Sequence, residues 1–286
     1  MKNNKIIALL TDFGTKDYFV GAMKGAILGV NPNANIVDIT HEIEPQDIRV
    51  ASFMLRACYR NFPPQTIFVC VVDPGVGSSR RAILVETEEY FFVAPDNGLL
   101  SFVFNEGRSP HVNKGAKVDE SALAHVRAST SNIRVFELTN EKFFAEDVSA
   151  TFHGRDLFAP VAAHLSNGVK QKEFGAEISD FKKFAETKPK TISKNKRQAE
   201  IIYIDRFGNL ITNLKREDLP ENFALEVGGK RIEKLQNYFS EAAKSEVFMI
   251  FGSADFLEIA VFQNSAKKFL KAEIGQKITV EKLTKP

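Results

Sequence analysis

The chain has 286 residues, of which 44% are apolar and 26% charged, and its formal net charge is +2. These values are typical of a globular protein with one large or two ordinary domains, and they exclude a disordered or fibrous chain. So small a net charge gives no general attraction to nucleic acid or acidic membranes, and we expect neither as a partner. The N-terminal apolar segment covers only residues 6–10. It is too short for a signal sequence or a membrane span, so we expect a cytoplasmic protein.

Apolar runs alternate with segments of helical spacing along the first third of the chain. Strands are predicted at 6–10, 36–39 and 67–72, and helices at 18–30 and 47–59. This β-α-β-α-β order favours a mostly parallel sheet with right-handed crossovers, and therefore an α/β fold. Two further strands are predicted at 82–86 and 90–94, whereas residues 107–138 show no clear pattern.

The chain has two cysteines, Cys58 and Cys70, and both stand among apolar residues. Two thiols cannot form a disulfide framework or a four-cysteine zinc site. We therefore expect free, buried thiols.

An acidic or amide residue follows three of the apolar runs. Asp12 follows the first run, Asp73 the third, and Asn97 the last, with Asp96 beside it. The carboxyl ends of parallel strands meet at one edge of a sheet, so these side chains predict a common ligand crevice. For Asp96, a simple turn closed by its own side chain is the better interpretation.

The turn after Asp73 has the sequence Pro-Gly-Val-Gly and returns two cations, Arg80 and Arg81, towards the carboxylate. Its glycines allow positive φ and a close approach of the backbone to a ligand. An acid and a guanidinium on such a turn can form one site. The alternative is an ordinary strand-to-helix turn with a surface ion pair.

One histidine stands in a setting that favours function. His153 lies in the sequence Phe-His-Gly-Arg-Asp, directly before an apolar helix predicted at 160–165. A lone histidine is more often structural, but the adjacent glycine and polar pair favour a functional role here. His41 is the only other histidine that we keep as an alternative.

Residues 181–198 hold seven Lys or Arg and one Glu without apolar periodicity. This composition predicts a linker at a domain boundary, and nucleic-acid binding by the basic run is the less favoured alternative. We therefore predict an α/β domain at 1–180, a linker at 181–198 and a second domain at 199–286.

Beyond the linker the pattern changes to short strands separated by turn residues. These strands are predicted at 199–204, 209–214, 223–227, 247–251, 257–261 and 277–283. Their number and spacing favour a small antiparallel β-barrel. Two polar breaks between them, 205–209 and 251–254, are either ordinary hairpins or carriers of ligand groups.

Six motifs between residues 11 and 260 occur in the order found in a known family. They are Thr-Asp-Phe-Gly, Val-Val-Asp-Pro-Gly-Val-Gly, Ala-Pro-Asp-Asn-Gly, Phe-His-Gly-Arg-Asp, Ile-Asp-Arg-Phe-Gly-Asn and Phe-Leu-Glu-Ile-Ala. With them the chain resembles the S-adenosyl-L-methionine (SAM) hydroxide adenosyltransferases, which are adenosine-forming SAM hydrolases related to fluorinases and chlorinases. The resemblance implies an N-terminal α/β domain, a C-terminal β-barrel and a homotrimer. Each site of that trimer would lie between one subunit's N-terminal domain and its neighbour's C-terminal domain.

The resemblance also implies a reaction, in which SAM and water give adenosine and methionine. The implied catalytic residues are Asp73, Arg80 and His153, with Arg80 preferred to Arg81 by its spacing from the aspartate. Asp12 is implied to bind the ribose hydroxyls. The remaining implied substrate-binding residues, near the adenosine or the methionine end, are Asp17, Asn97, Asp205, Asn209 and Ser253.

These residue types suit the implied reaction. Attack at ribose C5′ expels a neutral thioether from a sulfonium, so the leaving group needs no acid. Water, with a pKa of about 15.7 in bulk, is a poor nucleophile. A guanidinium can stabilise developing hydroxide and an aspartate can orient or accept the proton, while His153 relays it or holds the others. The reaction requires no metal or other cofactor, since SAM is the substrate.

Two other functions are the alternatives: a SAM-dependent halogenase, and a SAM or adenosine sensor without turnover. The halogenating relatives have tyrosine in place of Asp73 and an extra loop that is absent from the short segment 81–90, which favours water over halide. Some of them have Ser-Arg where this chain has Ser253 and Ala254, so the contact to the methionine carboxylate is left open. A metallohydrolase using Asp12, Asp73 and His153 is the weakest alternative, because their spacing is not that of a known metal site.

Overall fold

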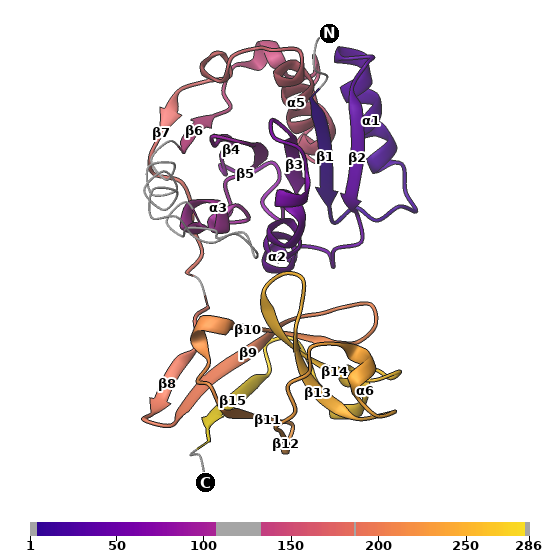
Figure 1. The fold of residues 1–286 in the computed structure, drawn as a ribbon. Coiled ribbons are helices and arrows are strands. Elements are labelled where there is room, and N and C mark those ends of the chain that lie inside the picture. Colours follow the sequence, from indigo (N-terminus) through magenta and orange to yellow (C-terminus); the bar gives the residue numbers. More distant parts are fainter. Residues whose placement is uncertain (1–4, 107–132, 186, 284–286) are drawn as a thin grey trace. The chain divides into compact units, whose positions relative to one another are not determined.

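The computed structural model describes residues 5–106, 133–185 and 187–283. The chain forms two compact units, Met1–Ala185 and Glu186–Pro286, which we call the N-terminal and C-terminal units (Figure 1). The domains predicted at 1–180 and 199–286 each fall within one unit. Most of the segment without a clear sequence pattern, residues 107–132, lies outside the described residues.

The N-terminal unit contains a seven-stranded sheet with the order β2-β1-β3-β5-β4-β6-β7. Its strands are β1 (Ile6–Thr11), β2 (Asn35–Thr40), β3 (Ile67–Val71), β4 (Ala82–Glu86), β5 (Phe91–Pro95), β6 (Arg134–Glu137) and β7 (Glu177–Ile178). Strands β2, β1, β3 and β5 are parallel neighbours, whereas β4, β6 and β7 pair antiparallel. The segment between β4 and β5 is too short for a parallel crossover, so these two strands form a hairpin and β5 joins β3. The expected α/β fold is confirmed, with an antiparallel half that the sequence pattern did not predict.

Helices cover both faces of this sheet. They are α1 (Phe19–Val30), α2 (Ile48–Cys58), α3 (Ser101–Glu106), a π-helix (Gly154–Phe158) and α5 (Ala159–Ser166). Successive strand residues point to opposite faces. Ile7 and Val69 therefore join the cluster that contains α1 and α5, while Phe68 contacts Tyr59, which follows α2.

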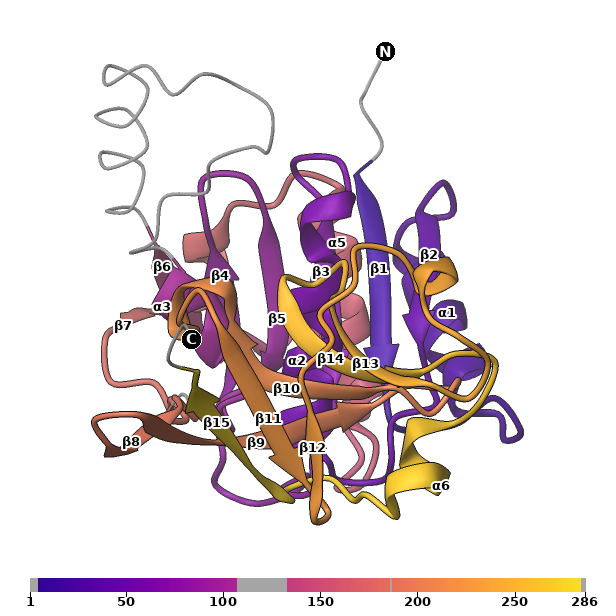
Figure 2. The same ribbon diagram turned by 60° about the horizontal axis from the view of Figure 1, so that its bottom comes forward.

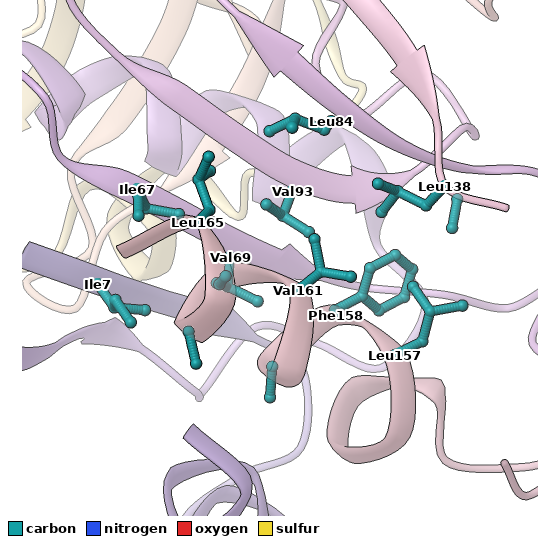
Figure 3. Packing of buried hydrophobic residues seen from close by; sticks show 14 of the residues in the cluster. Ile7, Ile67, Val69, Leu84, Val93, Leu138, Leu157, Phe158, Val161 and Leu165 are labelled. Atoms are coloured by element: carbon teal, nitrogen blue, oxygen red, sulfur yellow. The ribbon is translucent and has the colours of Figure 1, made fainter. Parts of the chain in front are cut away.

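The core on the α5 face fixes the start of that helix. Figure 3 shows Phe158, Val161 and Leu165 beside strand residues such as Val69 and Val93. Phe158 and Val161 are fully buried, and each such side chain contributes about 1.5–3 kcal/mol relative to an exposed one. The residues that directly precede this helix are therefore held against the sheet.

The C-terminal unit is an antiparallel, nearly closed barrel of eight strands (Figure 2). They are β8 (Lys190–Ser193), β9 (Lys196–Ile204), β10 (Leu210–Lys215), β11 (Phe223–Val227), β12 (Lys230–Ile232), β13 (Val247–Phe251), β14 (Phe256–Val261) and β15 (Lys277–Lys282). The order is β12-β11-β15-β9-β10-β14-β13, with β8 paired to β9. An isolated bridge between Leu235 and Met249 joins the segment after β12 to β13. The C-terminal unit also contains the α-helix α6 (Ala266–Leu270). The prediction of a β-barrel did not include this helix.

The prediction of a linker at 181–198 is wrong for the second half of that segment. Strand β8 and the first residues of β9 lie there and pair with each other. All four residues of β8 are exposed, so the strand is held by backbone hydrogen bonds and shows no apolar alternation. For this reason the sequence resembled a solvated connector.

Both cysteines are free, as expected. Cys70 is buried, and Cys58 is half-buried. Burial raises the pKa of the Cys58 thiol to about 11 and also raises the pKa of the Cys70 thiol well above its usual value. Neither thiol is therefore activated as a nucleophile. Within the described ranges, no helix has the length and apolar character needed to cross a membrane.

Candidate active site

Asp73, Arg80 and His153 form one hydrogen-bonded chain. Nε of Arg80 lies 3.0 Å from Oδ1 and 2.8 Å from Oδ2 of Asp73, and Nη2 donates to the same carboxylate. Nη2 of Arg80 also lies 2.7 Å from Nδ1 of His153. The side chains of Arg80 and Asp73 are 7% and 5% exposed. The structure therefore brings together the three residues that the resemblance implied as catalytic.

The ends of two neighbouring parallel strands position the acids of the site. Strands β1 and β3 pair in register up to Thr11 and Val71. Asp12 and Asp73 follow these strands by one and two residues, at the same edge of the sheet. This is the arrangement that the sequence pattern predicted for a ligand crevice.

The turn between β3 and β4 folds Arg80 back onto Asp73. Gly77 has a φ of +74°, and a Cβ atom there would lie 2.4 Å from the backbone oxygen of Ala150. Ser78 Oγ donates to the Gly75 oxygen at 2.6 Å and accepts from the Arg80 amide at 3.2 Å. Glycine is thus required at position 77 by both backbone conformation and space.

The contact with Arg80 fixes the tautomer of His153. A guanidinium has only donors, so Nδ1 must be the unprotonated, accepting nitrogen, and a neutral ring carries its hydrogen on Nε2. Burial and then the charge of Arg80 lower the pKa of His153, although Asp73, Asp156 and the Ser149 backbone act in the opposite direction. The imidazole is therefore held neutral and serves Arg80 as an acceptor.

A cavity of about 400 Å³ lies beside this chain of side chains. Asp12, Asp73 and His153 line it together with Phe13, Phe19 and Phe152. The three phenylalanines contact one another, with ring centroids 5.1–5.8 Å apart. The cavity thus has an apolar aromatic wall and a few polar groups, which is the usual character of a small-molecule site.

Sequence reasoning did not assign this aromatic wall. Phe13 and Phe152 stand inside motifs that were recognised, beside Asp12 and His153, so a signal existed. With 25 phenylalanines in the chain, however, core packing was the default interpretation of each.

Asp12 is held by the loop after β2. Its Oδ2 accepts from the backbone N–H of Gln46 at 2.8 Å. Burial raises the pKa of Asp12, and the Gln46 hydrogen bond partly opposes this shift. The alternative histidine, His41, is buried and lies behind this turn, with Nδ1 2.8 Å from Oγ1 of Thr11. His41 thus supports the turn and does not line the cavity.

Arg81 belongs to a different network from Arg80. Its Nη2 lies 2.9 Å from Oδ2 of Asp96, and its Nη1 lies 2.8 Å from Oδ1 of Asp180. Asp96 is buried and its other oxygen accepts from the Lys182 amide at 2.7 Å. Arg81 therefore ties the end of the N-terminal unit to the sheet.

Two more residues of the N-terminal unit were predicted to bind substrate. Asp17 is exposed in the bend before α1. Asn97 uses its side chain within the backbone: Nδ2 donates to the Val72 oxygen at 2.8 Å and Oδ1 accepts from Leu99 at 3.2 Å. Asn97 thus braces the end of β3, next to Asp73. Neither Asp17 nor Asn97 lines the cavity.

Asp205, Asn209 and Ser253 belong to the C-terminal unit. Oδ1 of Asp205 accepts from the amides of Phe207 and Asn209 at 2.9 and 2.8 Å, and Nδ2 of Asn209 donates to Oδ2 at 2.8 Å. This is a closed turn between β9 and β10. Ser253 is exposed in the turn between β13 and β14.

No group of three or more His, Cys, Asp or Glu side chains suited to a metal ion occurs among the residues that the structure describes.

The fold and the cavity define a class: α/β proteins that bind a ligand at the carboxyl edge of a parallel sheet, here with an appended antiparallel barrel. Two family models identify the member of this class. The SAM hydroxide adenosyltransferase N-terminal domain matches residues 7–175, and the C-terminal domain of the same family matches residues 199–279. The chain belongs to the SAM hydroxide adenosyltransferase family.

Individual relatives agree with this assignment. The chain is 34% identical to the (R)-S-adenosyl-L-methionine hydrolase of Methanocaldococcus jannaschii, over 96% of this chain and 95% of the relative. It is 29% identical to a fluorinase of Actinoplanes sp., over 76% and 74% of the two chains. The crystal structure of an uncharacterized conserved protein from Thermotoga maritima is similar with a TM-score of 0.81 and 35% identity, over 97% and 100% of the chains.

Proposed function

We propose that this protein hydrolyses SAM to adenosine and L-methionine. In the reaction a water oxygen forms a bond to ribose C5′ while the bond from C5′ to sulfur breaks. The electron pair of that bond returns to sulfur, so the sulfonium leaves as a neutral thioether, and one proton of the water is released. The observation that carries the proposal is the chain from Asp73 through Arg80 to His153 beside a cavity lined by Asp12.

Asp73 and Arg80 act on the water in this proposal. Asp73 lines the cavity, so its carboxylate orients the water and accepts its proton during attack. Arg80 holds that carboxylate through several hydrogen bonds and places a positive charge where hydroxide develops. An ion pair this buried contributes little net stability, because desolvation offsets the attraction. Its presence is therefore better explained by chemistry than by folding.

The rest of the cavity binds the nucleoside in this proposal. A carboxylate such as Asp12 accepts two hydrogen bonds from the ribose hydroxyls. The wall of Phe13, Phe19 and Phe152 covers apolar surface of the substrate and excludes water from other directions. Asp17 and Asn97 act near the adenosine or the methionine end of SAM, Asn97 through its support of the Asp73 strand end.

The C-terminal unit completes the site in this proposal. Asp205, Asn209 and Ser253 contact the adenosine or methionine portion from a neighbouring subunit of a homotrimer. We also propose that the protein acts in the cytoplasm and without a bound cofactor.

The test is adenosine release from SAM by the purified protein, followed by chromatography. Arg80→Lys should lower kcat about 100-fold or more, since a single ammonium cannot bond both carboxylate oxygens and the imidazole. Arg81→Lys is the matched control and should stay within a few-fold of wild type, because Arg81 contacts Asp96 and Asp180 instead. Equal losses in both variants, or no adenosine from the wild type, would contradict the proposal.

Two additions to the assay separate the alternative functions. The first addition is chloride or fluoride, because a fluorinase is among the relatives. If the protein is a halogenase, the product is 5′-halo-adenosine. Calorimetry that shows tight adenosine binding without turnover identifies a sensor. We expect neither result.

A further inference from the structure

Asp156 is a buried carboxylate that the proposed reaction does not use. It lies in the π-helix and is 1% exposed. An isolated charge at such a position is costly, so its partners indicate its purpose. Oδ2 accepts from the amide and the hydroxyl of Ser149 at 2.9 and 2.7 Å, and Oδ1 accepts from Nε of Arg155 at 2.5 Å.

These hydrogen bonds close the turn that ends at His153. Ser149 Oγ accepts from the Phe152 amide at 3.1 Å. In return, the amides of Arg155 and Asp156 donate to the Phe152 oxygen at 3.1 and 3.2 Å. Residues 149–152 are thus fixed at both ends by Asp156, and His153 is the next residue in the chain.

The same turn reaches the imidazole itself. The Ser149 backbone and the Asp156 charge both favour the protonated ring of His153, against the effect of burial and of Arg80 on its pKa. The backbone oxygen of Ala150, in this turn, also leaves no room for a side chain at position 77 of the Arg80 turn. The turn therefore contacts both segments that supply the chain of catalytic side chains.

We propose that Asp156 is a positioning residue: through Ser149 and Phe152 it sets the His153 ring so that Nδ1 accepts from Arg80, which in turn orients Asp73. This inference rests on the proposed function for its readout. Asp156 does not line the cavity and touches no reacting atom. Its effect on His153 is geometric. This effect depends on the Asp156 oxygen that accepts from Ser149 more than on the negative charge of Asp156.

The structure supplies variants that separate these effects. Asp156→Ala removes all acceptors, whereas Asp156→Asn keeps one oxygen that can accept both Ser149 bonds. Ser149→Ala removes the hydroxyl and its link to Phe152 but keeps the amide bond. Asn31→Ala is the matched control: Asn31 is also a buried polar residue with side-chain bonds, to Ser166 and Asn33, but it lies beyond the far end of α1.

The measurements are kcat and KM for adenosine release, with thermal unfolding of each variant. Asp156→Ala should lower kcat about 10- to 100-fold with a smaller rise in KM, because Asp12, Phe13 and Phe19 keep their places in the cavity although Phe152 belongs to the released turn. Asp156→Asn should stay within about threefold of wild type, and Ser149→Ala should fall between the two. Asn31→Ala should lose stability but keep its kcat.

A spectroscopic readout covers the case in which Asp156→Ala does not fold. With ¹⁵N-labelled histidine, the His153 ring of the wild type should show one tautomer with its hydrogen on Nε2. Asp156→Asn should keep that signature, and Ser149→Ala should show a mixture of ring states.

The inference is overturned if Asp156→Asn loses as much kcat as Asp156→Ala, if Ser149→Ala matches wild type in both readouts, or if Asn31→Ala loses kcat in parallel with its stability. A wild-type protein that releases no adenosine contradicts the proposed function instead. The ring spectra then still decide whether Asp156 positions His153.

Discussion

Glu258 shows how one side chain can make the stability of a unit depend on pH. It lies on β14, and burial followed by the nearby charge of Asp205 raises its pKa to about 7. A Cβ atom on Gly252 would lie 1.7 Å from Oε1 of Glu258. Glycine at position 252 therefore leaves the space that the carboxyl group occupies. Burying the ionised form is costly, and the native unit favours the protonated one.

Between pH 4.5 and 7 the native state therefore holds a proton that the unfolded chain releases. The stability contributed by this group is fully present below pH 4.5 and falls as the pH rises towards 7. Glu258→Gln removes this dependence, so the variant should gain stability relative to wild type as the pH rises through this range. Urea unfolding of both proteins at pH 5 and pH 8 measures the difference. The exposed Glu226→Gln is the control, and a constant difference between Glu258→Gln and wild type would refute the prediction.

At the residue scale, sequence reasoning found the acids of the site more reliably than their partners. Asp12 and Asp73 were predictable because each follows a buried strand of a parallel sheet. Arg80 and Arg81 could not be separated by local pattern, since adjacent residues share the same composition around them. The folded turn separates them: Arg80 bonds Asp73 and His153, whereas Arg81 bonds Asp96 and Asp180.

At the scale of elements, two turns that are far apart in sequence depend on each other. The turn that carries Arg80 packs at Gly77 against the Ala150 oxygen, and Ala150 lies in the turn that precedes His153. The π-helix that follows places Gly154 against the Phe13 ring, where a Cβ atom would be 3.1 Å away. Such irregular helical turns are frequent at functional sites.

Gly77→Ala should therefore lower both stability and activity. Its φ of +74° and the 2.4 Å approach to Ala150 each penalise a side chain. We expect a loss of about 3 kcal/mol in the free energy of unfolding, from roughly 1–2 for the backbone and the rest for the clash. Gly168→Ala is the matched control, because Gly168 also has positive φ, +94°, but faces open space. It should cost only about 1–2 kcal/mol and leave adenosine release unchanged; equal unfolding losses would show that the contact with Ala150 is unimportant.

Long apolar or periodic elements were predictable, and short exposed ones were not. The strands β4, β11 and β13 begin and end where the apolar pattern predicted. Strands β8 and β12 and helix α6 were missed, since they have three to five residues and are ordered by pairing and packing with neighbours. The π-helix was also invisible to the pattern, because five residues are too few to distinguish its period from that of an α-helix.

At the scale of the whole molecule, the proposed site draws residues from both units. Asp205 and Asn209 form a rigid turn in the C-terminal unit, while the cavity with Asp73 belongs to the N-terminal unit. Sequence reasoning could list these residues through the resemblance, but no local pattern states which residues meet across subunits. The homotrimer with shared sites is therefore a proposal that needs its own experiment.

Mixed assemblies provide that experiment. Asp73→Ala and Asn209→Ala subunits, each inactive alone, are co-expressed with different tags and purified through both. In a cyclic trimer that contains both kinds, one site in three combines an intact N-terminal unit with an intact neighbouring C-terminal unit. We expect about a third of wild-type activity and a trimeric mass by light scattering. Absence of activity in the mixed assemblies would show that each site is built within one subunit.

The seclusion of the Asp73 and Arg80 pair affects how the enzyme responds to its surroundings. Dissolved ions weaken the attraction between charges that water surrounds, but they screen much less a pair of side chains of which less than a tenth is exposed. A change in salt concentration inside the cell would thus affect this pair little. For the same reason, the strength of this ion pair is altered more by substitutions in the protein than by the salt concentration of the buffer.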